Sequence, residues 1–331
     1  MINENEKKQN QEKLLSICIL SYNQAEEIER LLISIKEQYS NEIEIIIRDD
    51  STNDKTEEIV KKYSQNIPIK YIRGAKEGID KTVIYLTNIA TGRFIWWMGD
   101  DTIEPGGVAE VLNIIKTEPT VGFIWANYQL VNTKIMAIDI GYSGCYINKN
   151  ELLKLGGAGL GFISATIFKK DIGMNALSEA ENFIGSLFAN LYIVLYVISK
   201  SEICYYLRGP IVICHPTTSQ EIKKLVSKPN GEINNRGFEV YGITFPSIIR
   251  RFSNDFEQNV IKKVIEKSFS QTWKGMYVGW IGGWDDPHGK KMILFKKYWR
   301  HPSAYLSIIL FSLPLSINKL FYKFYKSFKK N

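Results

Sequence analysis

Strand-like and helix-like segments alternate along the first 126 residues, and this alternation constrains the fold more than any other feature. Amphipathic helical patterns separate the apolar runs, as the spacing of Ile28, Leu31 and Leu32 illustrates. Strands that alternate with helices in this way form a parallel sheet with right-handed crossovers, so the sequence predicts an α/β fold. The runs with the length and composition of buried strands are residues 14–20, 43–47, 67–72, 94–98 and 122–126.

Local signals predict the remaining elements. Asp54, followed three residues later by Glu57, resembles a capping box at the start of a helix. Residues 161–168 are predicted to form a strand and residues 183–198 one long helix. Residues 203–214 are predicted to form two strands that break at the Gly-Pro pair within them, and the pattern becomes helical from about residue 233.

Two pairs of acidic residues follow predicted strands. Asp49 and Asp50 come after residues 43–47, and Asp100 and Asp101 come after residues 94–98. Ligands of open parallel sheets bind at the carboxyl ends of the strands. Paired carboxylates there suit a hard divalent cation, Mn²⁺ or Mg²⁺, and such a cation suits a diphosphate. The pattern indicates nucleotide-sugar chemistry; the alternatives are a turn or helix cap at the first pair and a solvated loop at the second.

Charge is concentrated at the C-terminal end of the chain. The net charge is +7, yet residues 290–331 alone contain ten Lys or Arg and no acidic residue, so the rest of the chain carries a net charge of −3. A nucleic-acid-binding protein would be basic over its body, so no nucleic-acid partner is expected. Four scattered cysteines indicate reduced thiols, and residues 1–13 lack the apolar stretch of a signal peptide, so a cytoplasmic location is expected.

Three motifs stand at a characteristic spacing in the first half of the chain. They are Ile-Leu-Ser-Tyr-Asn at residues 19–23, Arg-Asp-Asp-Ser-Thr-Asn-Asp at residues 48–54 and Gly-Asp-Asp-Thr-Ile-Glu-Pro-Gly at residues 99–106. Together they resemble the GT-A glycosyltransferases of family 2, the inverting bacterial polysaccharide type, over roughly residues 14–220. Residues 77–82, Glu-Gly-Ile-Asp-Lys-Thr, resemble more narrowly the abequosyltransferase-like branch that acts in O-antigen assembly.

The resemblance implies a GT-A fold, a Rossmann-like, mostly parallel sheet flanked by helices. The GT-A domain would span residues 1–225, with a donor half at about 14–126 and an acceptor half at about 127–220. Residues 226–331 would form a helical C-terminal region.

The resemblance also implies roles for residues that would bind the donor. Tyr22 would flank the nucleobase, and Asp50 would accept a hydrogen bond from the base or the ribose, since a carboxylate is a strong acceptor. The other donor-binding candidates would line the pocket, support Asp50 or contact a phosphate: Leu20, Ser21, Asn23, Asp49, Lys81 and His215. Lys81 has the alternative of a solvated helix residue, and His215 that of a structural loop residue.

Metal binding is implied for the second acid pair. Asp101 would coordinate the Mn²⁺ or Mg²⁺ ion that bridges the donor diphosphate, and Asp100 would contact the ribose or assist at the ion. Negative charge grows on the departing nucleoside diphosphate, and a cation offsets that charge. Thr102 stands where many relatives carry a third acid, so this chain has one site carboxylate fewer.

The general base departs from the pattern of the family. An inverting transfer needs a carboxylate that takes the proton from the acceptor hydroxyl. Relatives place an aspartate where this chain has Ser186, and a neutral serine cannot serve as that base. Glu181 is the preferred catalytic candidate, with Glu179 next and Asp171 more distant. The alternative is that the glutamates only favour the dipole of the following helix.

The expected function is an inverting, metal-dependent transfer of a sugar from a nucleotide-diphosphate donor to a saccharide. We expect this acceptor to be carried on a lipid such as a polyprenyl, at the inner face of the cell membrane. Residues 301–318 carry no Lys, Arg, Asp or Glu, but they are shorter and more polar than the about 20 apolar residues that a membrane-spanning helix needs. Their basic and aromatic flanks suit peripheral binding to an anionic leaflet, and the alternative is packing on the chain's own domain or on a second subunit of a homo-oligomer.

Two other functions are also compatible with the sequence. A GT-A-like nucleotidyltransferase would usually carry a glycine-rich, basic loop after the first strand, and residues 21–25 are not such a loop. A non-catalytic nucleotide-sugar-binding scaffold is motivated by Ser186, which stands in the place of the general base.

Overall fold

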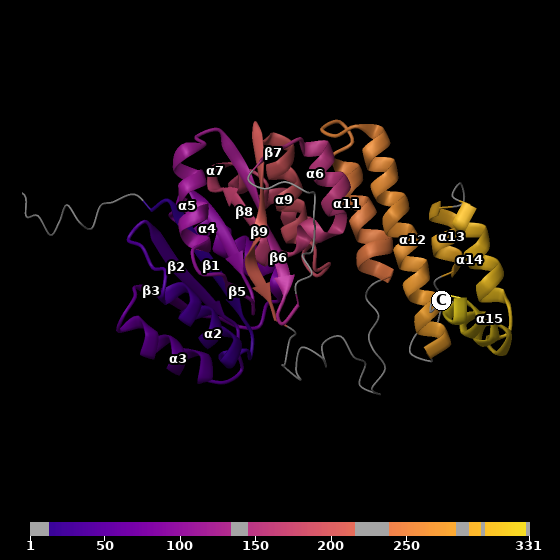
Figure 1. Cartoon of the computed structure of the whole chain (residues 1–331), viewed down its shortest axis with the longest axis horizontal. Helices are drawn as coiled ribbons and strands as arrows, with labels where there is room; N and C mark the ends of the chain where they lie inside the picture. The colour runs from indigo at the N-terminus through magenta and orange to yellow at the C-terminus, as the bar shows by residue number, and fades with distance from the viewer. Residues whose placement is uncertain (1–12, 134–144, 216–237, 283–290, 299–301, 329–331) are drawn as a thin grey trace, which may run out of the picture. The chain divides into compact units, whose positions relative to one another are not determined.

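The computed structural model describes residues 13–133, 145–215, 238–282, 291–298 and 302–328 (Figure 1). The chain divides into two compact units, Met1–Ser219 and Gln220–Asn331. The first unit contains a sheet with helices packed on it, and the second is helical.

Within the described residues, the first unit is built on a nine-stranded sheet in the order β3-β2-β1-β4-β8-β6-β9-β5, with β7 also paired to β9. The strands are β1 (Leu15–Ser21), β2 (Ile43–Asp49), β3 (Ile69–Arg73), β4 (Phe94–Met98), β5 (Thr102–Ile103), β6 (Val121–Leu130), β7 (Cys145–Ile147), β8 (Thr166–Lys169) and β9 (Ile203–Cys214). Strands β1 to β4 pair in parallel, as the alternation predicted. Beyond β4 the sheet is mixed, because β8 runs antiparallel between β4 and β6, whereas β6 and β9 are parallel.

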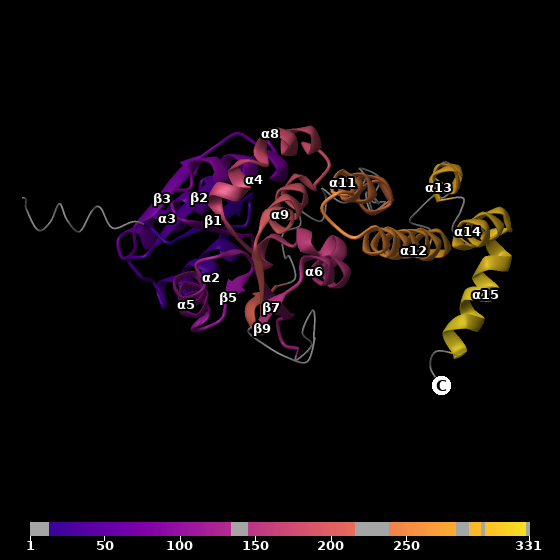
Figure 2. The same ribbon diagram turned by 90° about the horizontal axis from the view of Figure 1, so that it is seen from above.

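Helices cover both faces of this sheet. Figure 2 shows α4 and α9 on one side and α2 and α5 on the other. The helices are α2 (Ala25–Lys36), α3 (Lys55–Ser64), α4 (Ile79–Ile89), α5 (Gly107–Thr117), α6 (Lys149–Gly156), α7 (Lys170–Met174), α8 (Leu177–Ala180) and α9 (Ala189–Lys200). Short 3₁₀ segments lie at Gly157–Gly161, Ile163–Ala165 and Glu181–Phe183.

Alternation along the strands divides the core between the two faces. Leu15, Ile17 and Ile19 are fully buried in one cluster with the apolar stripes of α2 and α5. On the other face Trp97 contacts Phe168 edge-on, with ring centroids 4.6 Å apart. Burial of an aliphatic side chain such as Leu15, Ile17 or Ile19 stabilises the fold by about 1.5–3 kcal/mol. The central strands are therefore firmly held, and the loops at their ends have a rigid base.

The sheet order brings the predicted ligand-binding loops together. Ser21 at the end of β1 pairs in register with Asp49 at the end of β2, and Ile19 of β1 pairs with Met98 of β4. The loops that follow β1, β2 and β4 consequently leave the sheet side by side at its carboxyl edge. Both acid pairs lie at this edge.

The capping box predicted at Asp54 is wrong. Asp54 occupies the N-cap position of α3, but its side chain makes no capping hydrogen bond. A guanidinium nitrogen of Arg73 lies 3.3 Å from its carboxylate instead. The Asp54 carboxylate thus contacts the opposite charge of Arg73 on β3 and not the end of the helix. Local sequence does not reveal this contact, because Arg73 lies 19 residues further along the chain.

Residues 203–214 form one strand of 12 residues, so the two strands predicted there are wrong. The β6–β9 ladder skips from the pair Ala126–Leu207 to the pair Tyr128–Val212, and the residues between bulge out. The Asn127 side chain fills the gap by donating to the Arg208 carbonyl at 3.0 Å. A bulge tolerates a proline that lacks an N–H, so the strand continues past its Gly-Pro pair.

The elements predicted at residues 161–168 and 183–198 are shorter than expected. Only Thr166–Lys169 is a strand, preceded by the 3₁₀ segments. The helix begins at Ala189, because Gly185 and Leu187 have φ of +86° and +67°. Those left-handed values cannot occur inside a right-handed helix.

The second unit consists of helices, as predicted for this part of the chain. They are a π-helical turn (Phe238–Thr244), α11 (Phe245–Arg251), α12 (Gln258–Gly282), α13 (Lys291–Tyr298), α14 (Pro302–Ser312) and α15 (Leu315–Phe328). The ring of Phe269 on α12 stacks on Tyr298 of α13 at 4.3 Å. Asn318 of α15 donates to the Leu310 carbonyl at 2.9 Å and closes the end of α14.

No single helix within the described residues has both the length and the apolar character that a membrane span requires. The segments Ala304–Ser312 and Leu315–Tyr322 meet that requirement only as a pair, and a bend of 119° separates them.

Candidate functional site

The loops after β1, β2 and β4 are tied to one another by side-chain hydrogen bonds. Asn23 adopts a left-handed φ of +53°, which asparagine tolerates better than most residues. Its side-chain oxygen accepts from the Thr52 N–H at 2.9 Å, and its own N–H donates to Ser51 Oγ at 2.8 Å. Gln24 donates to Asp100 Oδ2 at 3.1 Å. The first loop is thus joined to both loops that carry acid pairs.

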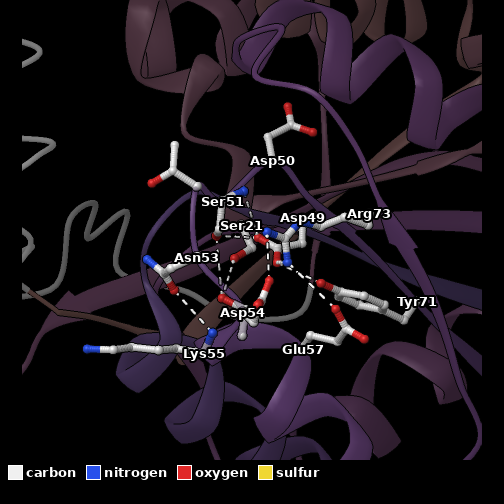
Figure 3. Close-up of polar contacts among 12 residues, drawn as sticks. Ser21, Asp49, Asp50, Ser51, Asn53, Asp54, Lys55, Glu57, Tyr71 and Arg73 are labelled. Atoms are coloured by element: carbon white, nitrogen blue, oxygen red, sulfur yellow. Dashed lines mark hydrogen bonds and ion pairs between the residues drawn. The ribbon is translucent and has the colours of Figure 1, made fainter.

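Asp49 is fully engaged by protein groups. Its side chain has no exposed surface, and it accepts from the Tyr71 hydroxyl at 2.8 Å and from the Ser51 N–H at 3.1 Å. Arg73 lies 3.9 Å away (Figure 3). Burial, followed by the hydrogen bond to Asp49, raises the pKa of Tyr71 to about 12. Asp49 therefore holds the loop in shape, and its predicted role in supporting Asp50 stays a prediction.

Asp50 points away from the Asp49 cluster (Figure 3). One carboxylate oxygen accepts from Arg48 Nε at 2.8 Å, and the other accepts from the Thr82 hydroxyl at 3.2 Å. The Glu77 N–H is 3.5 Å from that second oxygen. A carboxylate offers about four acceptor positions, so these contacts leave capacity for one more donor. Asp50 is fixed in place between the β2 loop and the start of α4.

Arg48 was not identified from the sequence, although it lies two residues before Asp50. Its guanidinium also pairs with Glu77 at 3.2 Å and lies 4.8 Å from the ring centre of Tyr85. It covers Gly74 so closely that a Cβ there would overlap it. The signal available in the sequence was the basic residue at the end of an otherwise apolar strand.

Tyr22 lies in the loop after β1, half-buried, with Lys76 beside it. The Lys76 ammonium is 2.8 Å from the Tyr22 hydroxyl and 4.4 Å from its ring centre. Leu20 and Ser21, also predicted to line this pocket, are largely buried at the end of β1. An aromatic ring with a cation beside it suits a nucleobase, which has a π-face and carbonyl acceptors.

Asp101 is a buried carboxylate at the end of β4. It has 2% exposure and accepts from the His215 N–H at 3.1 Å. Burial, assisted by the charge of Asp100, raises the pKa of Asp101 to about 6, although hydrogen bonds from Ser164 and Cys214 act in the opposite direction. Burial also raises the pKa of Asp100.

Neither carboxylate forms an ion pair with Lys or Arg in the described part of the chain. Asp101 is buried and Asp100 is half-buried, and Arg30 acts on Asp100 only electrostatically. The pair therefore keeps excess negative charge, which is the condition that a bound cation relieves.

The donor set at this corner fits a cation shared with a substrate. The described residues include no group of three or more His, Cys, Asp and Glu placed to hold a metal ion, so a cage made of protein ligands alone is not seen among them. Mg²⁺ is commonly held by one or two carboxylates, with waters and substrate phosphates as its other ligands. Asp100 and Asp101 fit that second type of site.

His215 lies next to this acid pair. Its Nε2 is 3.1 Å from the Thr102 hydroxyl. Burial lowers the pKa of His215, and Arg30 adds to the effect, so the ring is neutral at physiological pH. A neutral imidazole can donate one hydrogen bond or ligate a metal.

The catalytic candidates lie on the segment before α9. Ser186 is half-buried, and its hydroxyl accepts from the Phe188 N–H at 3.1 Å. Glu179 and Glu181 are exposed, on α8 and at the start of the 3₁₀ turn that follows it. Lys81 on α4 pairs with Glu77 at 3.3 Å and remains half exposed. None of these residues enters the contacts of Asp100 and Asp101 described above.

Ser164 is a further residue that the sequence did not reveal. Its hydroxyl supports Asp101 and lies 3.4 Å from the Gly99 N–H, while its carbonyl accepts from Trp96 Nε1 at 2.8 Å. A serine in a short 3₁₀ turn carries no distinctive pattern, and only the pairing of β8 with β4 brings it to the acid pair.

Comparison with known proteins shows which family this domain resembles. Residues 16–171 match the family model described as Glycosyl transferase family 2. The chain carries a family 2 glycosyltransferase domain. The sequence resemblance predicted this family, and the prediction is confirmed.

Two curated relatives and one solved structure illustrate the similarity of this glycosyltransferase. Abequosyltransferase RfbV of Salmonella typhimurium is 26% identical over 64% of this chain and 69% of that protein. An uncharacterized glycosyltransferase of Haemophilus influenzae is 28% identical over 51% of this chain and 60% of its own length. The structure of S. aureus TarS 1–349 in complex with UDP-GlcNAc aligns with a TM-score of 0.60 at 14% identity, covering 79% of this chain and 73% of that one. The predicted GT-A fold is confirmed.

Proposed function

We propose that the protein is an inverting glycosyltransferase that moves a sugar from a nucleoside-diphosphate donor to a saccharide acceptor with the aid of a divalent cation. One observation carries the proposal: two adjacent carboxylates, the buried Asp101 and the half-buried Asp100, lie at the carboxyl edge of a GT-A sheet and form no ion pair with Lys or Arg among the residues that the structure describes. The relative named abequosyltransferase supports O-antigen or similar cell-surface polysaccharide synthesis as the setting.

The residues of the first and second loops would hold the nucleoside. Tyr22 presents its ring to the base, and Asp50 offers its remaining acceptor position to an N–H of the base or a hydroxyl of the ribose. Arg48 holds the Asp50 carboxylate in its orientation. Lys76 can donate to a base carbonyl or a phosphate, because it is exposed beside Tyr22.

The residues at the end of β4 would hold the diphosphate. Asp101 and Asp100 would carry Mn²⁺ or Mg²⁺, which when bound offsets the negative charge that develops on the departing nucleoside diphosphate. The ring of His215, whose backbone N–H contacts Asp101, would donate a hydrogen bond to a phosphate oxygen. Gln24 orients Asp100 for this task.

The proton of the acceptor hydroxyl needs a carboxylate base, and Glu181 is the proposed one, with Glu179 as the second choice. Both are exposed and therefore accessible to an acceptor, whereas Ser186 has no basic group to offer. If Glu181→Gln and Glu179→Gln both release nucleoside diphosphate at the wild-type rate, this assignment is wrong.

The C-terminal unit would bring the enzyme to a lipid-linked acceptor. Side chains of α14 and α15 leave an apolar surface exposed; they include Tyr305, Leu306, Ile309, Leu320 and Phe321, with exposures between 47% and 69%. Lysines flank this surface in sequence. Exposed aromatic and aliphatic groups combined with basic residues suit the interface of an anionic leaflet. We propose peripheral binding to the inner face of the membrane, with a polyprenyl-linked saccharide as the acceptor.

A thermal-shift screen tests the donor assignment. UDP-, GDP-, CDP- and dTDP-sugars are added with Mn²⁺ and with EDTA. A ligand that binds only the folded state stabilises it by about 2.7 kcal/mol at a hundredfold excess over Kd. We expect one nucleotide to raise the Tm only when Mn²⁺ is present, and Asp101→Asn to abolish that rise. A protein that responds to no nucleotide, or that responds equally in EDTA, would contradict the proposal.

A non-catalytic nucleotide-sugar-binding scaffold is the second candidate, because Ser186 occupies the place of the expected base. The two functions differ in turnover. A scaffold would show the thermal shift and yet release no nucleoside diphosphate with any saccharide or polyprenyl-linked acceptor.

A further inference from the structure

Asp80 is a buried carboxylate that the roles described so far do not use. It lies in the first turn of α4 with 4% exposure. Its oxygens accept three backbone N–H groups from a segment more than 100 residues away: Gly185 at 2.8 Å, Leu187 at 2.9 Å and Ala189 at 3.0 Å. Hydrogen bonds to an ionised acceptor are about twice as strong as neutral ones. This one side chain therefore fixes the backbone of the whole loop before α9.

The loop that Asp80 holds is strained. Gly185 and Leu187 have φ of +86° and +67°, and for leucine the left-handed region is unfavourable because its Cβ crowds the backbone. Ile184 and Leu187 nevertheless expose 41% and 39% of their surface. Backbone strain that the surroundings enforce is concentrated at functional sites. A glycine at position 187 would adopt this φ freely, so the exposed leucine points to a role for its side chain.

Helix capping accounts for only part of this arrangement. The Ala189 N–H is one of the orphan groups at the start of α9, and Asp80 satisfies it from outside the helix. The N–H groups of Gly185 and Leu187 precede the helix and belong to the strained turn itself. Two of the three hydrogen bonds thus hold the turn, which contains Ser186, the position where the sequence resemblance leads us to expect the catalytic base.

The same turn of α4 also reaches the nucleoside pocket. Thr82, two residues after Asp80, donates to Asp50 at 3.2 Å. Glu77, just before the helix, contributes its N–H to the same oxygen of Asp50 at 3.5 Å. The first turn of α4 therefore contacts Asp50 on one side and, through Asp80, the loop Ile184–Phe188 on the other.

We propose that Asp80 is a positioning residue that holds the loop Ile184–Phe188 in its strained conformation and couples that loop to nucleotide binding at Asp50 through the first turn of α4. The proposal rests on the proposed function for the identity of the pocket ligand. A donor nucleotide that strengthens the contact between Asp50 and Thr82 would reduce the motion of the first turn of α4. Through Asp80 it would also reduce the motion of the loop Ile184–Phe188. Acceptor binding and donor binding would then each favour the other.

Amide hydrogen exchange on the full-length protein tests both halves of the proposal. Asp80→Asn replaces a carboxylate that accepts hydrogen bonds from three N–H groups by an uncharged amide. One of its two polar atoms is a nitrogen, which donates and cannot accept. Hydrogen bonds to charged groups contribute about 1.5–3 kcal/mol each, which corresponds to roughly tenfold or more in opening equilibrium. We expect residues 185–189 to exchange at least about tenfold faster in the variant, while β1 and β4 keep wild-type rates. Glu110→Gln, in the first turn of α5 and exposed, is the matched control.

The coupling is measured by adding UDP, GDP, CDP or dTDP with Mn²⁺. In the wild type we expect the nucleotide that raises the Tm to slow exchange in residues 185–189, and in Asp80→Asn the same nucleotide to raise the Tm without slowing exchange there. Equal protection in both proteins would overturn the coupling. Unchanged exchange of the loop in Asp80→Asn without nucleotide would overturn the positioning role.

Two loop variants keep the test decisive if Asp80→Asn does not fold. Gly185→Ala meets no atom within 4 Å of its new Cβ and is strained only by its φ, so we expect it to speed exchange in residues 185–189 as Asp80→Asn does. Leu187→Gly keeps the turn and should leave that exchange slow. Similar rates in these two variants would refute the strained-turn argument. If no nucleotide affects the wild type, the proposed function and the coupling both fail, whereas the ligand-free exchange still decides the role of Asp80.

Discussion

Replacing Asp101 by asparagine should raise the free energy of unfolding of the ligand-free protein. The same substitution should abolish Mn²⁺-dependent nucleotide binding. The carboxylate is 2% exposed and its pKa is raised from 3.8 to about 6, so keeping it ionised in the folded state costs free energy at neutral pH. At about 1.4 kcal/mol per pH unit the cost is about 3 kcal/mol. Asparagine retains an oxygen for the His215 N–H and removes the charge.

The pH dependence gives the sign of the effect. A group whose folded-state pKa is raised costs nothing below its unfolded pKa of 3.8, and the cost grows until the pH passes about 6. Asp101→Asn should therefore unfold at a higher temperature than the wild type at pH 7.5, by about 3–10 °C for a gain of about 1–3 kcal/mol, and the difference should vanish near pH 4.

Differential scanning calorimetry in EDTA measures this difference. Asp171→Asn is the matched control, because its side chain is 69% exposed and the substitution should change stability by less than about 0.5 kcal/mol. An Asp101→Asn protein that is no more stable than the wild type at pH 7.5 would refute the reasoning. A stability difference that persists at pH 4 would show that packing, and not the buried charge, is the cause.

Further substitutions test the loops and the C-terminal unit. Asp49→Asn should lower the free energy of unfolding by about 2–4 kcal/mol in urea, because a fully used buried acceptor is lost; a change under 1 kcal/mol would count against its structural role. Gly74→Ala should displace the guanidinium of Arg48 and weaken nucleotide binding in calorimetry as much as Arg48→Ala, and the double variant should be no weaker; additive losses would mean that Gly74 acts otherwise. Leu320→Asp should reduce cosedimentation with phosphatidylglycerol vesicles, whereas Ile33→Asp, an exposed position on α2, should not; unchanged binding by Leu320→Asp would contradict the membrane proposal.

The donor half could be predicted from sequence because its signals are local. The five apolar runs became β1 to β4 and β6, since the pattern of neighbouring residues alone identifies each as a strand. β3 is only partly buried, which agrees with its place at the edge of the sheet. The acid pairs at the ends of β2 and β4 follow from the same alternation, because parallel strands bring their carboxyl ends to one edge. The motif spacing then indicated the family.

The rest of the first unit depends on contacts between distant residues. Asn127 fills a bulge opposite Arg208, and that contact lets β9 continue where a Gly-Pro pair indicated a break. Asp80 holds the turn at Gly185, which delays the start of α9 to Ala189. Local sequence around one residue of each pair does not predict its contact with the other.

The candidate site shows the same division between local and distant information. Asp49, Asp50, Asp100 and Asp101 were found from position alone, and their predicted functions stay predictions. The groups that set their properties, Arg48 and Ser164 among them, emerged only from the folded arrangement. The pKa of about 6 at Asp101 arises mainly from burial, so the residues next to it in the sequence could not predict it.

Strand β9 has a consequence for engineering this enzyme. It pairs with β5 directly after the acid pair, and the residue that follows it, His215, donates its N–H to Asp101. The corner that would hold the diphosphate is thus completed by a strand encoded about 100 residues later. Chimaeras that exchange only the N-terminal half between relatives would separate Asp101 from the backbone that supports it, so donor preference should transfer between homologues only when the graft includes Ile203–Cys214 and His215.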